Sequence, residues 1–97
     1  MTSDKIRWGI VATGNIAGQF ATDLKQSHSG VLAGAASRQA ASARAFCETH
    51  GGTASDNYDA LLQRDDIDSV YIATPHNSHM AWTLKAMAAG KAVLCEK

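Results

Sequence analysis

The residue best suited to chemistry in this chain is a lysine at the end of an apolar segment. That segment reads Ala92-Val93-Leu94-Cys95-Glu96-Lys97 and has the pattern of a buried strand. Sites in parallel α/β proteins gather at the carboxyl ends of strands. We therefore expect Lys97, with Glu96 beside it, to face a site shared with the turns that follow earlier strands.

The turn after the first candidate strand has the spacing of a phosphate-binding loop. Ala12, Gly14 and Ala17 occupy the three positions of the pattern G-x-G-x-x-G/A, with alanine as a mild departure at the first. The next helix would direct its free amides and the positive end of its dipole at an anion. The residues expected to hold phosphate are Ala12, Thr13, Gly14, Asn15 and Ile16. The alternative is a plain tight turn.

The end of the second candidate strand indicates which nucleotide would bind. An NAD site normally has an acid there, but no acid occurs between Asp23 and Glu48. The strand ends instead in Ser37 and Arg38. Guanidinium donors match phosphate oxygens, which favours NADP, with its 2′-phosphate, over NAD. The alternative is an arginine that is simply solvated.

A third segment should form the opposite lip of the same crevice. In a doubly wound sheet the strand at 70–73 lies beside the first strand, so the residues after it face the glycine turn. The residues expected to line this lip are Ala73, Thr74, Pro75, His76 and His79. Both histidines could instead lie in a loop and a helix start without chemistry. Four scattered histidines and two cysteines lack metal-ligand spacing, so no metal site is predicted.

The apolar periodicity predicts the elements that must position these residues. Strands are expected at 6–11, 31–37, 53–55, 70–73 and 92–95, and helices at 16–24 and 40–50. A short helix follows Asp56 as its N-cap, and another begins near Asn77 with Met80, Leu84, Met87 and Ala88 on one face. This alternation predicts an α/β fold, a Rossmann-type doubly wound parallel sheet, as one domain over residues 1–97.

Composition narrows the class of protein. The 97 residues carry no net charge, with 45 % hydrophobic and 19 % charged residues, as in an ordinary globular domain. The sequence has no basic stripe of the kind that binds nucleic acid, so a nucleic-acid partner is not predicted. It also has no apolar run long enough for a membrane span. The N-terminus lacks the apolar core of a signal peptide. Cys47 and Cys95 fit buried free thiols in a reducing cytosol, so we expect a cytoplasmic protein.

With these residues in place, the chain resembles the N-terminal domain of the Gfo/Idh/MocA oxidoreductases over essentially its whole length. The sequence is most similar to the dimeric dihydrodiol dehydrogenase branch of the family, which uses NADP. The residues that carry the resemblance lie at 7–17, 36–38, 73–79 and 89–97. The last segment is the most specific, because it matches the start of the family's Glu-Lys-Pro signature.

The resemblance implies hydride transfer between a nicotinamide and a secondary alcohol or ketone, on a sugar, cyclitol or diol. It implies that Lys97 is catalytic, holding the substrate hydroxyl and favouring its deprotonated form, while Glu96 lies near the nicotinamide ribose. Thr74, Pro75, His76 and His79 would line the nicotinamide half of the crevice.

The resemblance also implies a second domain that supplies substrate contacts and a dimerisation sheet. Because the chain ends before the proline of the signature, we expect that domain to be absent and these 97 residues alone to be inactive. We expect a homo-oligomer. Two alternatives stay open: a stand-alone dinucleotide-binding module without turnover, and a folded fragment that binds nothing tightly. Lys97 favours the enzyme, since a pure binding module has no obvious use for it.

Overall fold

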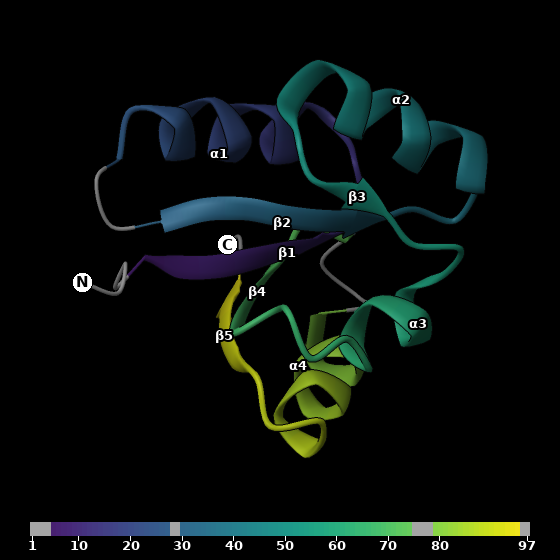
Figure 1. Cartoon of the computed structure of the whole chain (residues 1–97). Coiled ribbons are helices and arrows are strands. Elements are labelled where there is room, and N and C mark those ends of the chain that lie inside the picture. The colour runs from purple at the N-terminus through teal and green to yellow at the C-terminus, as the bar shows by residue number, and fades with distance from the viewer. Residues whose placement is uncertain (1–4, 28–29, 75–78, 96–97) are drawn as a thin grey trace.

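The five strands form one parallel sheet with the first strand at its centre. The computed structural model describes residues 5–27, 30–74 and 79–95. The strands are β1 (Ile6–Val11), β2 (Gly30–Ala36), β3 (Thr53–Ala54), β4 (Ser69–Ile72) and β5 (Ala92–Cys95), in the order β3-β2-β1-β4-β5 (Figure 1). All four pairings are parallel. The predicted doubly wound sheet of Rossmann type is confirmed.

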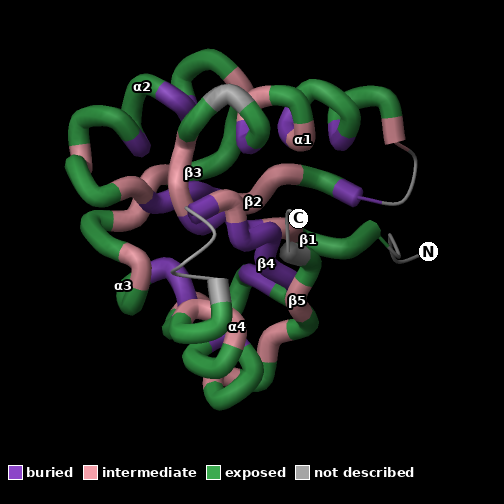
Figure 2. Tube along the Cα trace, turned by 180° about the vertical axis from the view of Figure 1, so that it is seen from behind, coloured by how far each residue is buried: buried purple, intermediate pink, exposed green. Residues whose placement is uncertain are grey.

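Helices cover both faces of the sheet. Helices α1 (Asn15–Lys25) and α2 (Ala40–His50) lie on one face, and α3 (Tyr58–Leu62) and α4 (His79–Ala88) lie on the other (Figure 1). Strands covered on both faces should be apolar throughout, and every residue of β4 is buried (Figure 2). The near-continuous apolar run that predicted this strand therefore has a structural reason.

Each face has its own hydrophobic core. Under α1 and α2, the ring of Phe20 stacks on Tyr71 with centroids 4.1 Å apart, and Trp8 meets Phe20 edge-on at 5.1 Å. Under α3 and α4, small and branched side chains pack without aromatic rings at the centre. The fully or nearly buried members of this second core are Val11, Ala36, Leu61, Leu62, Ile67, Val70, Ile72 and Ala86.

The N-cap of α3 differs from the sequence prediction. Asn57, not Asp56, occupies the cap, and its Oδ1 accepts a hydrogen bond from the amide of Ala60 at 2.7 Å. Both residue types can cap a helix, so composition does not discriminate between them. A cap side chain must reach the amide of the third helical residue, here Ala60. Asn57 does so because it stands directly before Tyr58.

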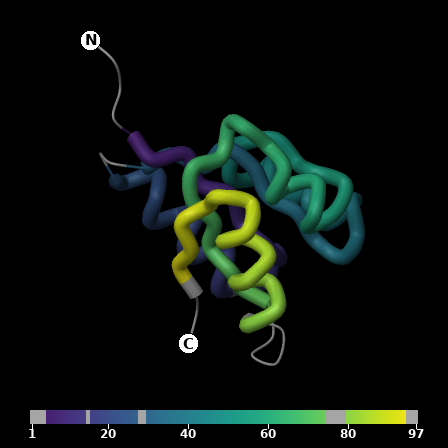
Figure 3. The backbone as a smooth tube through the Cα atoms, turned by 90° about the horizontal axis from the view of Figure 1, so that it is seen from below, coloured from purple at the N-terminus to yellow at the C-terminus, as the bar shows by residue number. Residues whose placement is uncertain are grey.

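The predicted apolar face of α4 points away from the sheet. Met80, Leu84 and Met87 are 75 %, 59 % and 60 % exposed, and Ala88 is exposed as well. Trp82, Ala86 and Ala89 cover the sheet instead. In the view from below, α4 lies in front of the sheet (Figure 3). The described part of the chain therefore leaves an apolar stripe uncovered on this helix, which we call the α4 stripe (Met80, Leu84 and Met87).

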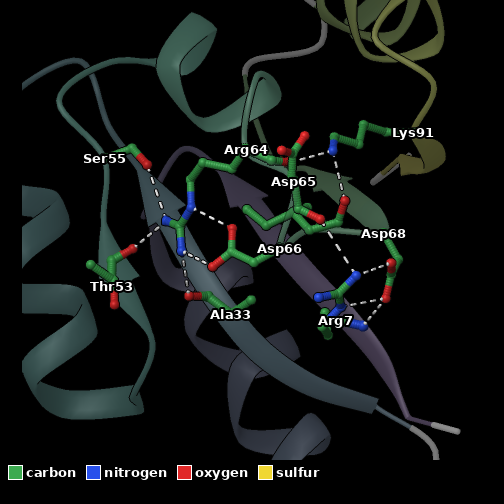
Figure 4. A network of polar contacts seen from close by, with 10 residues as sticks. Arg7, Ala33, Thr53, Ser55, Arg64, Asp65, Asp66, Asp68 and Lys91 are labelled. Atoms are coloured by element: carbon green, nitrogen blue, oxygen red, sulfur yellow. Dashed lines mark hydrogen bonds and ion pairs between the residues drawn. The ribbon is translucent and has the colours of Figure 1, made fainter.

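An arginine that sequence reasoning did not single out joins β2 to β3. From the turn after α3, the Arg64 guanidinium donates to the carbonyl oxygens of Thr53 at 2.9 Å and Ala33 at 3.1 Å (Figure 4). It also donates to Ser55 Oγ at 3.1 Å and forms an ion pair with Asp66 at 2.8 Å. This side chain therefore satisfies two backbone acceptors on neighbouring strands.

Gly34 makes room for Arg64. A Cβ at residue 34 would lie 2.3 Å from Arg64 Nη1 and 2.6 Å from the Thr53 carbonyl oxygen. A glycine within a strand often marks such a close approach. The glycine at residue 34 of β2 is thus the sequence feature that permits the Arg64 contact.

Two more cations hold the loop before β4. Lys91 Nζ donates to the carbonyl oxygens of Arg64 and Ile67. The Arg7 guanidinium binds both carboxylate oxygens of Asp68, at 2.9 and 3.0 Å. That hydrogen bonding lowers the pKa of Asp68 to about 2. Because Arg7 and Asp68 are exposed, solvent screening keeps the contribution of this pair to stability small.

Replacing Arg64 should destabilise the fold. We expect Arg64→Met to lower the free energy of unfolding by about 2–3 kcal/mol, since the carbonyls of Ala33 and Thr53 lose their donor. Arg44→Met removes an exposed arginine from α2 and should cost under about 0.5 kcal/mol. Urea unfolding of the two variants measures the difference. Equal destabilisation would show that Arg64 adds nothing beyond an ordinary surface arginine.

Candidate functional site

The turns after three central strands meet at one edge of the sheet. Val11, at the end of β1, pairs with Ala36 of β2 and with Ile72 of β4, so these strands end level with one another. The amide of Ala12 donates to the Ala36 carbonyl at 2.8 Å, and that of Ala73 donates to the Val11 carbonyl at 3.0 Å. The described residues that directly follow β1, β2 and β4 are therefore brought to the same edge.

The first position of the phosphate pattern carries backbone strain. Ala12 has a φ of 84°, the only positive φ of a non-glycine residue in the described ranges. An L-residue in this region costs roughly 1–2 kcal/mol, which explains why the pattern usually has glycine there. Alanine is thus a more costly departure than its size suggests. The hydrogen bond from its amide to β2 helps to hold the turn in this conformation.

The second position of the pattern opens onto free space. Gly14 is the N-cap of α1 with an extended backbone (φ −80°) and no side-chain cap hydrogen bond. A Cβ built at Gly14 would meet nothing within 4 Å. The first amides of a helix have no partner inside the helix, and no acidic residue stands in the first turn of α1. This end of α1 is consequently suited to an anion that approaches the backbone closely.

The end of β2 carries a cationic side chain close to a second helix N-terminus. Arg38 is exposed, and the ion pairs found among the described residues use Arg7, Arg64 and Lys85 instead. Ser37 Oγ accepts from the amide of Gln39 at 3.4 Å. Gln39 caps α2 without a side-chain hydrogen bond, and the first turn of α2 lacks acids. A second helix N-terminus therefore lies next to an available guanidinium.

Only part of the predicted opposite lip is described. Ala73 is half-buried and Thr74 buried directly after β4. His79 begins α4, but its side chain, like that of Asn15, is not described. The remaining predicted site residues, Pro75, His76, Glu96 and Lys97, lie outside the described residues, so their roles stay predictions.

The hollows described elsewhere on the surface have none of the predicted site residues in their walls: an open one of about 680 Å³ lies along α1 beside His50, and one of about 270 Å³ lies between α3 and α4. A third, of about 160 Å³, lies where α1 ends and β2 begins, with Lys5, Leu24 and His50 in its wall. That volume is below the range typical of ligand pockets, and the hollow is at the opposite edge of the sheet. Within the described ranges, no three His, Cys, Asp or Glu side chains gather as a metal site.

The geometry fits a dinucleotide better than a single phosphate. Two helix N-termini and one guanidinium lie along the same edge, and each favours a negative group. A dinucleotide has anionic groups at separate points, namely a pyrophosphate and, in NADP, a 2′-phosphate. The end of β2 carries Ser37 and Arg38 and has no carboxylate to take the ribose hydroxyls of NAD.

Comparison with known families gives the same fold and class. Residues 6–97 match the family model described as "Oxidoreductase family, NAD-binding Rossmann fold", named for Gfo/Idh/MocA. The chain belongs to this family. The match takes in the turn after β1, the end of β2 and the segment after β4.

Curated members of the Gfo/Idh/MocA family align with the chain as a fraction of their length. A trans-1,2-dihydrobenzene-1,2-diol dehydrogenase from Bos taurus is 41% identical over 96 residues, 95% of this chain and 28% of that protein. A dTDP-3,4-didehydro-2,6-dideoxy-alpha-D-glucose 3-reductase from Streptomyces violaceoruber is 53% identical over 62 residues, 64% of this chain and 18% of that protein. The expected likeness to dihydrodiol dehydrogenases is confirmed.

Solved structures of the family superpose closely on the chain. A 3-ketoreductase from Actinomadura kijaniata, crystallised with NADP and TDP-benzene, gives a TM-score of 0.93 at 37% identity. The match covers 96% of this chain and 29% of that one. The chain therefore spans under a third of the length of such relatives.

Relieving the strain at Ala12 should stabilise the fold. We expect Ala12→Gly to raise the free energy of unfolding by about 0.5–1 kcal/mol, because glycine adopts a positive φ without a Cβ clash. Ala45→Gly, at an exposed position in the interior of α2, should lower it by about 1 kcal/mol. Denaturant unfolding of both variants compares the same substitution in two backbone contexts. A loss of stability in both would argue against strain at Ala12.

Proposed function

We propose that this chain is the NADP-binding domain of an oxidoreductase. The enzyme would transfer a hydride between the nicotinamide and a secondary alcohol or ketone of a sugar, cyclitol or diol. The observation that carries the choice of cofactor is Arg38, exposed at the carboxyl end of β2 beside the N-terminus of α2. NAD is the alternative cofactor.

Charge favours the phosphorylated cofactor. A guanidinium binds phosphate oxygens with charge-assisted hydrogen bonds, and the dipole of α2 adds to its attraction for an anion. Relatives support the same preference, since one is named D-xylose 1-dehydrogenase (NADP(+)) and the Actinomadura kijaniata reductase was solved with NADP. The pyrophosphate of the cofactor would lie on the Gly14 end of α1.

The proposal also assigns roles in substrate binding and catalysis. Lys97 would hold the substrate hydroxyl and favour its deprotonated form, and Glu96 would lie near the nicotinamide ribose. A second domain would supply the remaining substrate contacts, which is in keeping with a match to only 27–30% of the length of several relatives. We also propose a cytoplasmic protein. None of the described helices is long and apolar enough to cross a membrane.

The competing function is a dinucleotide-binding module without turnover. It shares the whole cofactor edge with the proposed enzyme and differs only in having no use for Lys97. A longer gene product that reduces or oxidises a sugar or diol, and loses that activity in Lys97→Ala while still binding NADP, would favour the enzyme.

Removing the Arg38 guanidinium should abolish the preference for NADP. By calorimetry we expect the chain to bind NADP more tightly than NAD, and Arg38→Ala to weaken NADP by about 10- to 100-fold, as for loss of a charged hydrogen-bond partner. NAD binding should change by less than about twofold, because it lacks the 2′-phosphate.

The matched control is Arg44→Ala, which removes the same charge from an exposed position further along α2. It should leave both affinities nearly unchanged. Equal affinity of the unmodified chain for NAD and NADP would contradict the assignment of Arg38, and binding of neither would contradict the cofactor site.

Self-association is a further part of the proposal. The α4 stripe is uncovered in the described structure, and β5 is an edge strand, which can pair with another chain. Exposed apolar surface of this kind favours association. We propose that a second copy of the chain covers the stripe when these residues are studied alone.

Lysines introduced on the α4 stripe should prevent self-association of the chain. Light scattering after size exclusion at high concentration should give a mass above 10.2 kDa, and Leu84→Lys with Met87→Lys should return it to that of one chain. Ala41→Lys with Ala45→Lys adds the same charge on α2 and should not. A single-chain mass without any substitution would refute this part.

A further inference from the structure

Two aromatic rings meet where α3 and α4 begin, and the function proposed above does not use them. Tyr58 is the first residue of α3, and Trp82 lies in the first turn of α4. Their ring centroids are 4.8 Å apart at an interplanar angle of 83°. Because both helices follow strands of a parallel sheet, their first turns lie at the carboxyl edge, which is the edge of the candidate site.

The Tyr58–Trp82 pair is held in place by the core beneath it, by the cap of α3 and by Lys85. Both rings are half-buried against the core that contains Val11 and Ala36. The Asn57 cap fixes the start of α3. Lys85 Nζ lies 4.6 Å from the Trp82 ring centroid and 3.7 Å from Asp59 of α3, so it links the two helices. The rings are therefore preorganised, with part of each surface left accessible.

The pair is close to the proposed 2′-phosphate position. Ala54 of β3 pairs with Ala35 of β2, and the amide of Ser55 donates to the Ala35 carbonyl at 2.9 Å. The segment leading to Tyr58 thus runs beside the end of β2, which continues into Arg38. Burial raises the pKa of Tyr58, and the positive charge of Arg38 acts in the opposite direction.

We propose that Tyr58 and Trp82 form an aromatic floor for the adenine ring of the cofactor, with the base stacked on one ring and meeting the other edge-on, since the two rings stand at 83° to each other. This inference rests on the proposed function, because it places the base next to the phosphate that Arg38 would hold. Adenine is flat and has apolar faces, and bases stack on aromatic side chains regardless of sequence. Preorganised rings lose little conformational entropy on binding.

The test uses tryptophan emission. The chain has two tryptophans, and Trp8 lies in β1 against Phe20, in the other core. Trp8→Phe therefore leaves Trp82 as the sole tryptophan without touching the site. Adenosine 2′,5′-bisphosphate is the probe, because it carries the base and the 2′-phosphate but no nicotinamide. Inorganic pyrophosphate is the control ligand without a base.

Adenosine 2′,5′-bisphosphate should change Trp82 emission with the affinity that calorimetry measures, and pyrophosphate should not. Tyr58→Leu and Trp82→Leu should each weaken this probe by about 5- to 100-fold, and Trp82→Phe should retain most of the affinity. If calorimetry shows binding while Trp82 emission stays constant, the floor is refuted and the cofactor site stands. If the probe does not bind at all, both fail.

Discussion

The structure depends on a central strand that is hydrogen-bonded in parallel on both sides. β1 pairs with β2 and with β4, and the pairings end level at Val11. That register brings three turns, far apart in the sequence, to one edge. It also requires close packing beneath the strand, since a Cβ at Gly9 would lie 2.9 Å from Ile67 Cδ1. The site is thus a consequence of strand pairing rather than of any single motif.

Four cationic side chains among the described residues fall into two groups with different tasks. Arg64 and Lys91 donate to backbone carbonyls, and Arg7 binds Asp68. These contacts join β2 to β3 and hold the loop that leads into β4. Arg38 has no such engagement with the described residues and lies at the edge where two helices begin. Its position is therefore suited to an anionic ligand.

Much of this architecture could be predicted from the sequence, for identifiable reasons. Apolar runs bounded by small and polar residues predict four of the strands, because buried parallel strands have little freedom in composition, and the short edge strand β3 lies within the expected segment 53–55. Helix α2 was placed at Ala40–His50 from its periodicity. The fold class and the family followed from motifs spread over the whole chain, and the comparison with the family model confirms both.

What the sequence did not reveal depends on geometry between distant residues. Arg64 has no pattern around it, and only the glycine at residue 34 hinted at a close approach. The stripe on α4 has the right period but faces outward, because smaller residues and Trp82 fit the sheet better. Strain at Ala12 is a property of φ, which a motif match does not report.

The most direct test is a map of amide chemical shifts in the isotope-labelled chain during titration with NADP. A bound dinucleotide should perturb the amides of the turn after β1 and the end of β2, chiefly Thr13, Gly14, Ile16, Ser37 and Arg38. The amides around Arg64 and Lys91 should stay unchanged. Perturbations that cluster instead around Lys5, Leu24 and His50, or none at saturating NADP, would contradict the proposed cofactor site.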